Sequence, residues 1–386
     1  MLGTGMWCRA KAGLKKCIVI IKLSSCSNVL IIYSVYQIIP QKMKDSIMTY
    51  KTIFSGRLEF GNARSYEKVL KMYEHRSENY YRSDILLNAE EVFDEDSTSL
   101  NVPRFITQST LKSWKNTINL LEYVAEYAVA GDLSAWMTEN GKILQHKMVE
   151  PQGDKVAVQA FLKGRELIKE SGKETEAKAA LSKAIEKFER HALAYERRGY
   201  VNFMLKNYED ALYDYSKSID INPGNSEPYL GRAFVKIAKD DYPGAIADLE
   251  NAIKKSIPLQ PIYWKARRIK ADCHMKLEEY DKVVFELKLF LKRNFSTDNP
   301  NYKWRKRAYF NYGKALLEQE AYAEAIQAFN AAQKIEGNDN DIKDADHLLY
   351  RGIALKKAGQ SGFVKDWKAA ANQGSERAAQ LLEENA

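Results

Sequence analysis

The chain repeats a residue pattern at an interval of thirty-four positions. The positions that match are mostly small or aromatic: Ala192, Tyr195, Gly199, Tyr208, Ala211, Tyr215 and Pro223 correspond to Ser226, Tyr229, Ala233, Tyr242, Ala245, Leu249 and Ile257. A fixed period of this length indicates one helical hairpin repeated along the chain, because each helix pair leaves an apolar face that only the next pair covers. The sequence therefore predicts a stacked array rather than a single compact core.

The residue types at these positions suit two helices that pack closely. Gly199 and Ala233 fall midway along the first helix of their units, where a larger side chain would hold the second helix away. Ala211 and Ala245 are the matching small residues on the second helix. Pro223 follows that helix and ends it, since proline lacks the amide hydrogen that a helix needs.

With this pattern, the segment resembles a tetratricopeptide repeat (TPR) array. The pattern extends to six units, and its structural positions are Gly164, Gly199, Ala211, Pro223, Ala233, Ala245, Ala271, Gly313, Ala325 and Gly352. The resemblance implies an α-helical solenoid, the TPR superhelix, of about six helical hairpins over residues 153–386. The last residues, from Asp366 to Ala379, resemble the closing segment of many bacterial TPR chains, so a C-terminal capping helix is expected.

The later repeats are longer than the basic period. The extra residues are expected in loops at Ser256–Pro261, Asn294–Asn301 and Gly337–Asp341, where proline, glycine, asparagine and aspartate cluster.

Residues 49–152 show no such repeat and predict a separate small α+β domain. The expected elements are strands at Thr52–Phe60, Asp84–Phe93 and Leu100–Ile106, a helix capped by Ser65, a helix capped by Ser109 and ended by Gly131, and a hairpin over Ala135–Met148 that turns at Asn140-Gly141. This order of strands and helices is that of a ferredoxin-like sandwich. RNA-recognition domains share it, but their glycine-flanked aromatic motif is absent. We therefore place Phe54, Phe60, Phe93 and Phe105 in the core.

The positive charge of the chain is concentrated at its start. The formal net charge is +8, but residues 1–48 hold seven basic residues and one acidic one, a net +6, which leaves +2 for the other 338 residues. This distribution argues against a general polyanion-binding role, and we expect no DNA partner.

Residues 1–48 are expected to be a poorly structured or apolar N-terminal extension. One interpretation is an upstream artefact of the gene model, with the true start at Met43 or Met48; the other is a signal or membrane anchor over residues 18–40, which would tether or export the protein. Only Cys273 lies outside this extension, so no internal disulfide is expected in the remainder. That argues for a reducing, cytoplasmic compartment.

The sequence offers no recognisable catalytic, metal or cofactor site. Cys273 and His274 are adjacent, but neighbours on a helix point about 100° apart and cannot act on one another as nucleophile and base. Gly141-Lys142 and Gly313-Lys314 lack the upstream glycine of a phosphate-binding loop. We therefore predict a protein that is not an enzyme and holds neither cofactor nor metal.

The TPR resemblance implies that the first helices of successive units line a concave groove that binds a protein or peptide. By pattern, the groove residues would be Tyr200, Phe203, Leu230, Phe234, Lys265, Arg268, Arg307, Phe310 and Lys314. Two basic runs, Lys265–Lys270 and Lys303–Arg307, open adjacent first helices. They suit an acidic peptide, a C-terminal carboxylate or a phosphate, or they merely solvate the helix ends, and both interpretations stay open.

The sequence thus predicts a scaffold or adaptor that binds a partner in the concave groove. The alternative is a nucleotide-binding, RNA-binding or regulatory module at residues 49–152, with the array as its targeting arm. The oligomeric state does not follow from the sequence.

Overall fold

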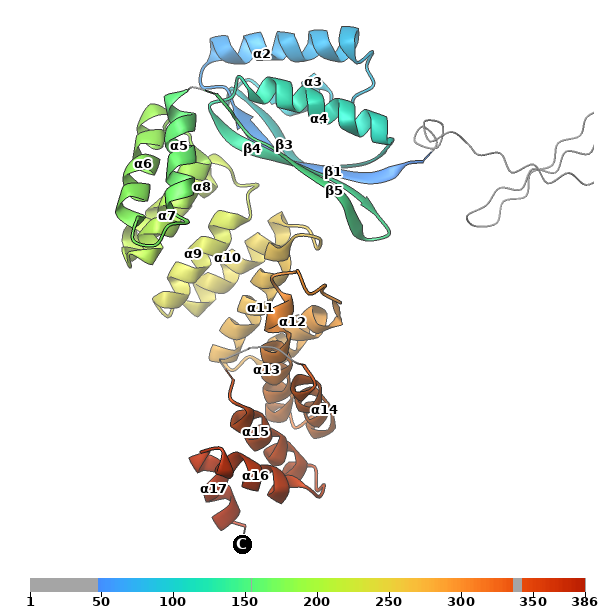
Figure 1. The fold of residues 1–386 in the computed structure, drawn as a ribbon, viewed down its shortest axis with the longest axis vertical. Coiled ribbons are helices and arrows are strands. Elements are labelled where there is room, and N and C mark those ends of the chain that lie inside the picture. The colour runs from blue at the N-terminus through green and yellow to red at the C-terminus, as the bar shows by residue number, and fades with distance from the viewer. Residues whose placement is uncertain (1–47, 154, 336–341, 386) are drawn as a thin grey trace, which may run out of the picture.

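The computed structural model describes residues 48–153, 155–335 and 342–385. It shows an α+β domain followed by a helical array that extends away from one face of that domain (Figure 1). The segment 18–40, Met43 and the predicted loop Gly337–Asp341 lie outside the described residues. No helix in the described part of the chain combines the length and the apolar character needed to cross a membrane.

The α+β domain is built on a five-stranded antiparallel sheet. Its strands are β1 (Tyr50–Glu59), β2 (Phe93–Asp94), β3 (Ser99–Ser109), β4 (Ala130–Glu139) and β5 (Lys142–Val149), in the spatial order β2-β3-β1-β4-β5. Helices α2 (Ala63–His75) and α4 (Leu111–Ala125) cover one face (Figure 1). Side chains alternate along β1, so Phe54 and Leu58 are buried in the domain core while Ser55 and Arg57 face the array.

The four phenylalanines placed in the core lie there. Phe54 and Phe60 are fully buried, and the partly buried Phe93 and Phe105 pack against the same cluster. The β4–β5 hairpin also turns where predicted, at Asn140 (φ 49°) and Gly141 (φ 75°). Two successive positive φ angles are what a type I′ turn requires.

The expected strand over Asp84–Phe93 is wrong. The segment contains the short helix α3 (Ala89–Val92), and only Phe93 and Asp94 pair in the sheet. Polar contacts explain the difference, because the Asp84 carboxylate accepts hydrogen bonds from Ser113 Oγ and Lys112 Nζ, both at 2.6 Å. These bonds tie the segment to α4 instead of leaving it extended beside β3.

The expected caps of the two long helices are also wrong. The side chain of Asn62, not Ser65, accepts the hydrogen bond at the start of α2, from the Ser65 amide at 2.9 Å. Thr110, not Ser109, caps α4 in the same way. The end of α4 is at Ala125 and not at Gly131, which lies in β4.

In the part of the array that the structure describes, six antiparallel helical hairpins are followed by a closing helix, which confirms the predicted helical array. The hairpins are α5–α6 (Val156–Leu167, Glu174–Lys187), α7–α8 (Ala192–Met204, Tyr208–Ile221), α9–α10 (Glu227–Ala238, Tyr242–Lys255), α11–α12 (Pro261–Lys276, Tyr280–Lys292), α13–α14 (Arg305–Glu318, Tyr322–Gln333) and α15–α16 (Asp344–Lys357, Phe363–Asn372). Helix α17 (Glu376–Glu383) packs on α16. The loop expected at Asn294–Asn301 lies between helices, and so does the one at Ser256–Pro261 except for Pro261, which begins α11.

Small residues on the first helices lie directly against large residues on the second. A Cβ atom added at Gly164 would lie 2.6 Å from Leu181, one at Gly199 would lie 3.1 Å from Tyr215, and one at Gly313 would lie 2.8 Å from Phe329. The fully buried residues are Ala211, Ala233, Ala245 and Ala325, and both Ala271 and Gly352 are also buried. The two helices of a hairpin can therefore approach closely only with these small residues.

Pairs of a partly buried arginine and a buried aspartate join the two helices in three of the described hairpins. The pairs are Arg198–Asp214 (2.7 Å), Arg232–Asp248 (2.7 Å) and Arg351–Asp366 (2.6 Å). The first two arginines also donate to a serine of the preceding second helix, Arg351 donates to Asn330 of α14, and each pair is bidentate. Each arginine therefore connects its own hairpin to the one before it.

The uncovered face of the sheet meets the edge of the array where consecutive hairpins are linked. Ile53 and Trp136 of the sheet pack with Ile257 of the α10–α11 loop. Arg104 of β3 donates hydrogen bonds to the backbone carbonyls of Lys254 (3.2 Å) and Ser256 (3.1 Å). The α+β domain and the array therefore share a packed junction.

Candidate functional site

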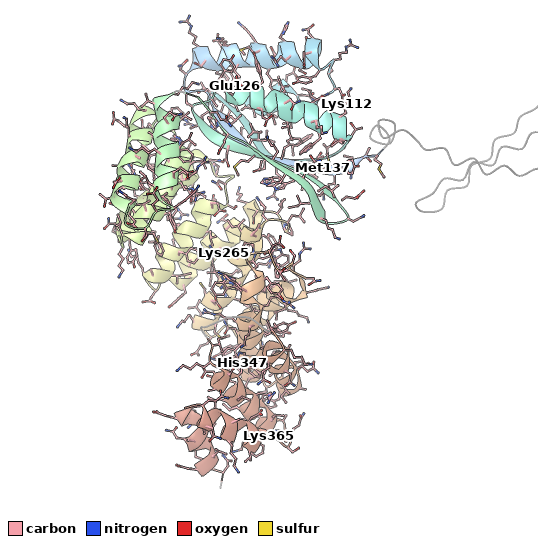
Figure 2. The ribbon with its side chains drawn as sticks, in the orientation of Figure 1. Lys112, Glu126, Met137, Lys265, His347 and Lys365 are labelled. Carbon is pink, nitrogen blue, oxygen red and sulfur yellow. The ribbon has the colours of Figure 1, made fainter. Side chains whose placement is uncertain are left out.

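The first helices of the hairpins form a continuous row. Helix α5 contacts α7, and the contacts continue through α9, α11 and α13 to α15. Such a row lies on the inner side of a curved solenoid, the surface that repeat proteins use for binding. Lys265 and His347, labelled in Figure 2, mark its middle and its C-terminal part.

An aromatic and apolar area covers the first part of this row. The rings of Phe203 (α7) and Phe234 (α9) lie 6.4 Å apart between centroids, and Lys265 Nζ of α11 lies 5.1 Å from the centre of the Phe234 ring. Tyr200 on α7 is 39% exposed. Three consecutive first helices therefore contribute to one surface, which ends at a lysine.

The next part of the row is basic and surrounds one tryptophan. Arg268 Cζ lies 3.9 Å from the centre of the Trp304 ring, Lys303 Nζ lies 5.6 Å away and Arg307 Cζ 5.9 Å away. Arg268 also forms an ion pair with Asp272. We call Lys265, Arg268, Lys303, Trp304 and Arg307 the cationic patch; it brings together residues from the two basic runs of the sequence.

A third cluster lies further along. Lys314 Nζ is 4.7 Å from the centre of the Tyr350 ring and 5.9 Å from that of Phe310. His347 packs against Phe310 with ring centroids 4.7 Å apart, and burial lowers the pKa of its imidazole to about 4, with Lys306 acting in the same direction. At neutral pH this histidine is uncharged, so the cluster carries the charge of Lys314.

Three of the predicted groove residues are buried in the array. Leu230 is 3% exposed, Arg268 is 6% exposed and Phe310 is 7% exposed. Leu230 belongs to the core cluster that α9, α10 and α11 share, and Phe310 belongs to the cluster of α13, α14 and α15. Side chains at this depth support the surface from beneath, whereas Tyr200 and Lys265 are exposed and Phe203 and Phe234 are partly exposed.

Acidic groups occupy the row on the side of the α+β domain. Burial raises the pKa of Glu196 on α7 to about 7, and Arg197 only partly offsets the effect. The pKa of Glu227 at the start of α9 is also raised by the surrounding protein, with Arg197 and Lys265 opposing the shift. The carboxyl groups on this face thus lie on α7 and α9, whereas the cationic patch lies on the side of α11 and α13.

The buried arginine–aspartate pairs and the sheet–array junction are the parts that the sequence prediction missed. The pairs had a signal, because Arg198 and Arg232, like Asp214 and Asp248, recur at the thirty-four-residue period. The sheet–array junction had no sequence signal, because a strand with one face in water shows the same alternation of polar and apolar residues as β1.

The adjacent cysteine and histidine lie in the array without forming a reactive pair. Cys273 is 2% exposed, and burial raises the pKa of its thiol to about 12. His274 is hydrogen-bonded to Glu279 instead. Among the described residues, no group of three or more histidine, cysteine or acidic side chains is arranged to hold a metal ion.

Two family models described as tetratricopeptide repeat match the chain, at residues 192–225 and 304–341. The chain is also similar to serine/threonine-protein phosphatase 5 of Mus musculus, at 29% identity over 124 residues, which are 32% of this chain and 23% of the phosphatase. The chain thus spans less than a quarter of that protein, and the match carries no catalytic activity over to it.

Several solved structures are similar to part of the chain. YrrB, described as a TPR protein with an unusual peptide-binding site, is 19% identical, with 53% of this chain and 98% of YrrB covered and a TM-score of 0.45. PilF of Pseudomonas aeruginosa is 14% identical, with 60% of this chain and 99% of PilF covered and a TM-score of 0.47.

The type IV pilus biogenesis factor PilW is 18% identical, with 60% of this chain and all of PilW covered and a TM-score of 0.44. These likenesses concern the fold of the array and carry no argument about function. The two matched segments are tetratricopeptide repeats, and they lie in an array of stacked helical hairpins that follows an α+β domain.

Proposed function

We propose that this protein is a scaffold or adaptor that binds an acidic segment of a partner protein on the inner face of the array. The observation that carries the proposal is the cationic patch. Arg268, Lys303 and Arg307 gather around the Trp304 ring, and Asp272 is the acidic group paired with Arg268. Several cationic groups beside one aromatic ring form a surface that attracts the carboxylates of an acidic segment.

The neighbouring aromatic area indicates what else the bound segment should contain. Tyr200, Phe203 and Phe234 would accept an apolar or aromatic side chain, and Lys265 and Lys303 would face carboxylates. A short segment with one apolar anchor beside several acidic residues therefore fits best. This favours the binding interpretation of the two basic runs over simple solvation.

The test uses a fluorescein-labelled peptide of glutamates around one tryptophan, titrated against the full chain by anisotropy. Reversing the charge of two exposed lysines, with Lys265→Glu and Lys303→Glu together, should weaken binding by about tenfold or more, because each reversal replaces an attraction with a repulsion. Lys254→Glu with Lys288→Glu is the matched control, since it makes the same charge change on exposed residues of the second helices α10 and α12.

Equal weakening by both double variants would mean that the peptide responds only to net charge, and the proposed site would be wrong. Arg268 is a poor choice for reversal, because it is buried and paired, and its loss would disturb the array itself.

We further propose that the α+β domain is ferredoxin-like, with β5 as an added edge strand. The support is the antiparallel order β4-β1-β3-β2, with both long helices on one face. The alternative function, nucleotide or RNA binding by residues 49–152, has weaker support. Phe54 and Phe60 lie in the core, and the other face of the sheet meets the array.

A thermal-shift screen of the full chain against nucleotides and RNA separates the two functions. Saturable stabilisation that the Lys265/Lys303 reversal leaves unchanged would favour the module at 49–152. We also propose a cytoplasmic location in a reducing compartment. Its support is that Cys273, outside the extension, is a buried free thiol.

A further inference from the structure

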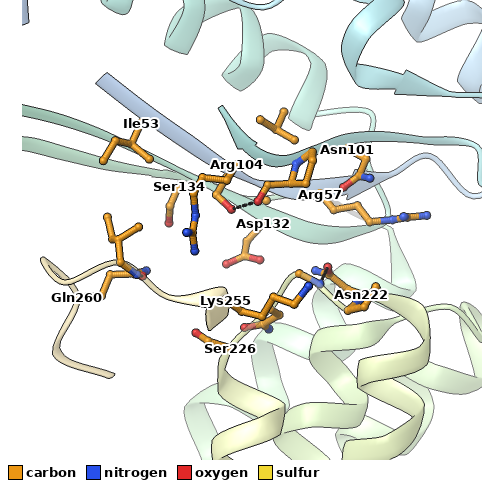
Figure 3. Close-up of a pocket in the computed structure, with 18 of the residues that line it drawn as sticks. Ile53, Arg57, Asn101, Arg104, Asp132, Ser134, Asn222, Ser226, Lys255 and Gln260 are labelled. Carbon is orange, nitrogen blue, oxygen red and sulfur yellow. Dashed lines mark hydrogen bonds between the residues drawn. The ribbon is translucent and has the colours of Figure 1, made fainter. Parts of the chain in front are cut away.

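A cavity of about 250 Å³ lies at the junction between the sheet and the array (Figure 3). Strands β1, β3 and β4 form one side, and the loops that follow α8 and α10 form the other. It is smaller than the roughly 300–1,000 Å³ of pockets for drug-sized molecules, so only a small ligand fits. Because neither part of the protein encloses it alone, a ligand there would contact both.

The charged groups in this cavity do not neutralise one another. Within the described ranges, neither the Asp132 carboxylate nor the Lys255 ammonium group makes a hydrogen bond or an ion pair. Among the described residues, Arg104 donates to backbone carbonyls and to no carboxylate, which leaves its charge uncompensated there. Arg57 also lines the cavity, but it is paired with Glu59 at 2.6 Å. In Figure 3, Asp132 and Arg104 point from the sheet toward the array.

The rest of the lining combines neutral polar groups with an apolar wall. Asn101 and Ser226 are polar, and Ser226, at the start of α9, makes no side-chain capping bond. Ile53, Trp136 and Ile257 form the apolar end. A few convergent polar groups beside an apolar wall at the junction of two parts of a protein are typical of small-molecule sites.

We infer that this cavity binds a small zwitterion of amino-acid size, with its carboxylate toward Arg104 and Lys255 and its ammonium group toward Asp132. A ligand with only negative charge fits less well, because Asp132 would repel it. The carboxyl of Asp132 is already unfavourably placed, since burial together with Glu150 and Glu227 raises its pKa to about 6. An ammonium group beside it would relieve both effects.

The experiment is a thermal-shift screen of the full chain with each of the common L-α-amino acids at millimolar concentration, followed by calorimetric titration of those that stabilise it. Inorganic phosphate and methylamine are the controls, because each carries charge of one sign only. At least one amino acid should raise the melting temperature saturably, and neither control should. If no amino acid raises the melting temperature, or if phosphate raises it as much as the best amino acid does, the inference is wrong.

Two variants locate the site. Asp132→Asn and Lys255→Gln should each weaken binding about tenfold, because each removes one charged contact at nearly constant size. The matched controls are Glu139→Gln, on the same strand but exposed, and Lys254→Gln, the exposed neighbour of Lys255. Equal weakening by the controls would place binding elsewhere.

A second readout covers the case in which a variant folds poorly. In the unmodified protein, the ligand should slow hydrogen exchange both in β4 and in the loop at residues 222–226, since both line the cavity. Slower exchange in neither segment would contradict the assignment.

Discussion

Glu196 places a carboxyl group on the inner face where water hardly reaches it. The residue is 6% exposed, and burial outweighs the ion pair with Arg197 at 3.0 Å, so its pKa is raised to about 7. The proton is therefore held more tightly in the folded chain than in the unfolded one. The resulting contribution to stability is complete below about pH 4.5 and is lost as the pH rises through 7.

Replacing this carboxyl by an amide should remove the penalty. Glu196→Gln should stabilise the protein by about 1–3 kcal/mol at pH 8 and should give no such gain at pH 4, where the wild-type carboxyl is protonated. Chemical denaturation at the two pH values measures this, with the exposed Glu189→Gln as control. A stabilisation of equal size at both pH values would show that charge burial is not the cause.

At the scale of residues, the sequence identified positions where close helix packing requires a small side chain. It did not identify which side chains the next hairpin buries. Glycine positions such as Gly199 and Gly313 were identifiable, because close helix packing tolerates little else. Leu230 and Phe310 were assigned to the groove by helix face, yet both are buried. The face of a single helix does not reveal how far the next hairpin covers it.

At the scale of elements, the thirty-four-residue period allowed every hairpin of the array to be predicted, whereas the caps of α2 and α4 were missed by one to three residues. At the start of each of these helices, two residues with side-chain oxygens lie close together in the sequence. They are Asn62 and Ser65 at α2 and Ser109 and Thr110 at α4, and each is an acceptable cap. The Asp84–Phe93 segment was mistaken for a strand, although its polar contacts to α4 hold it away from the sheet.

The arginine–aspartate pairs should contribute to the cohesion of the hairpins. Asp248 accepts bonds from Arg232 and Lys236 and is 2% exposed, so Asp248→Asn leaves two cations without their counter-charge. We expect a loss of about 3 kcal/mol, as for other broken buried pairs. Urea denaturation measures it, and Asp220→Asn, exposed on α8, should change the stability by less than about 0.5 kcal/mol. Similar losses for the two variants would rule out this role.

At the scale of the whole molecule, the sheet packs against α7 and the α10–α11 loop, and the binding surface that we propose lies on the first helices that follow. Ile53 and Trp136 hold that junction together with Ile257, and Arg104 adds bonds to the same loop. The acidic groups of α7 and α9 lie next to the domain, and the cationic patch lies beyond them. A bound acidic segment would therefore be oriented with its carboxylates on the cationic patch.

Photo-crosslinking from two tyrosines tests the central claim, that partners bind the inner face. Tyr200 of the first helix α7 is 39% exposed and Tyr213 of the second helix α8 is 55% exposed, so a benzoylphenylalanine at either position is accessible to solvent. In native lysate, the probe at position 200 should crosslink a partner protein and the probe at position 213 should not. Crosslinks to the same partner from position 213, with none from position 200, would contradict the account.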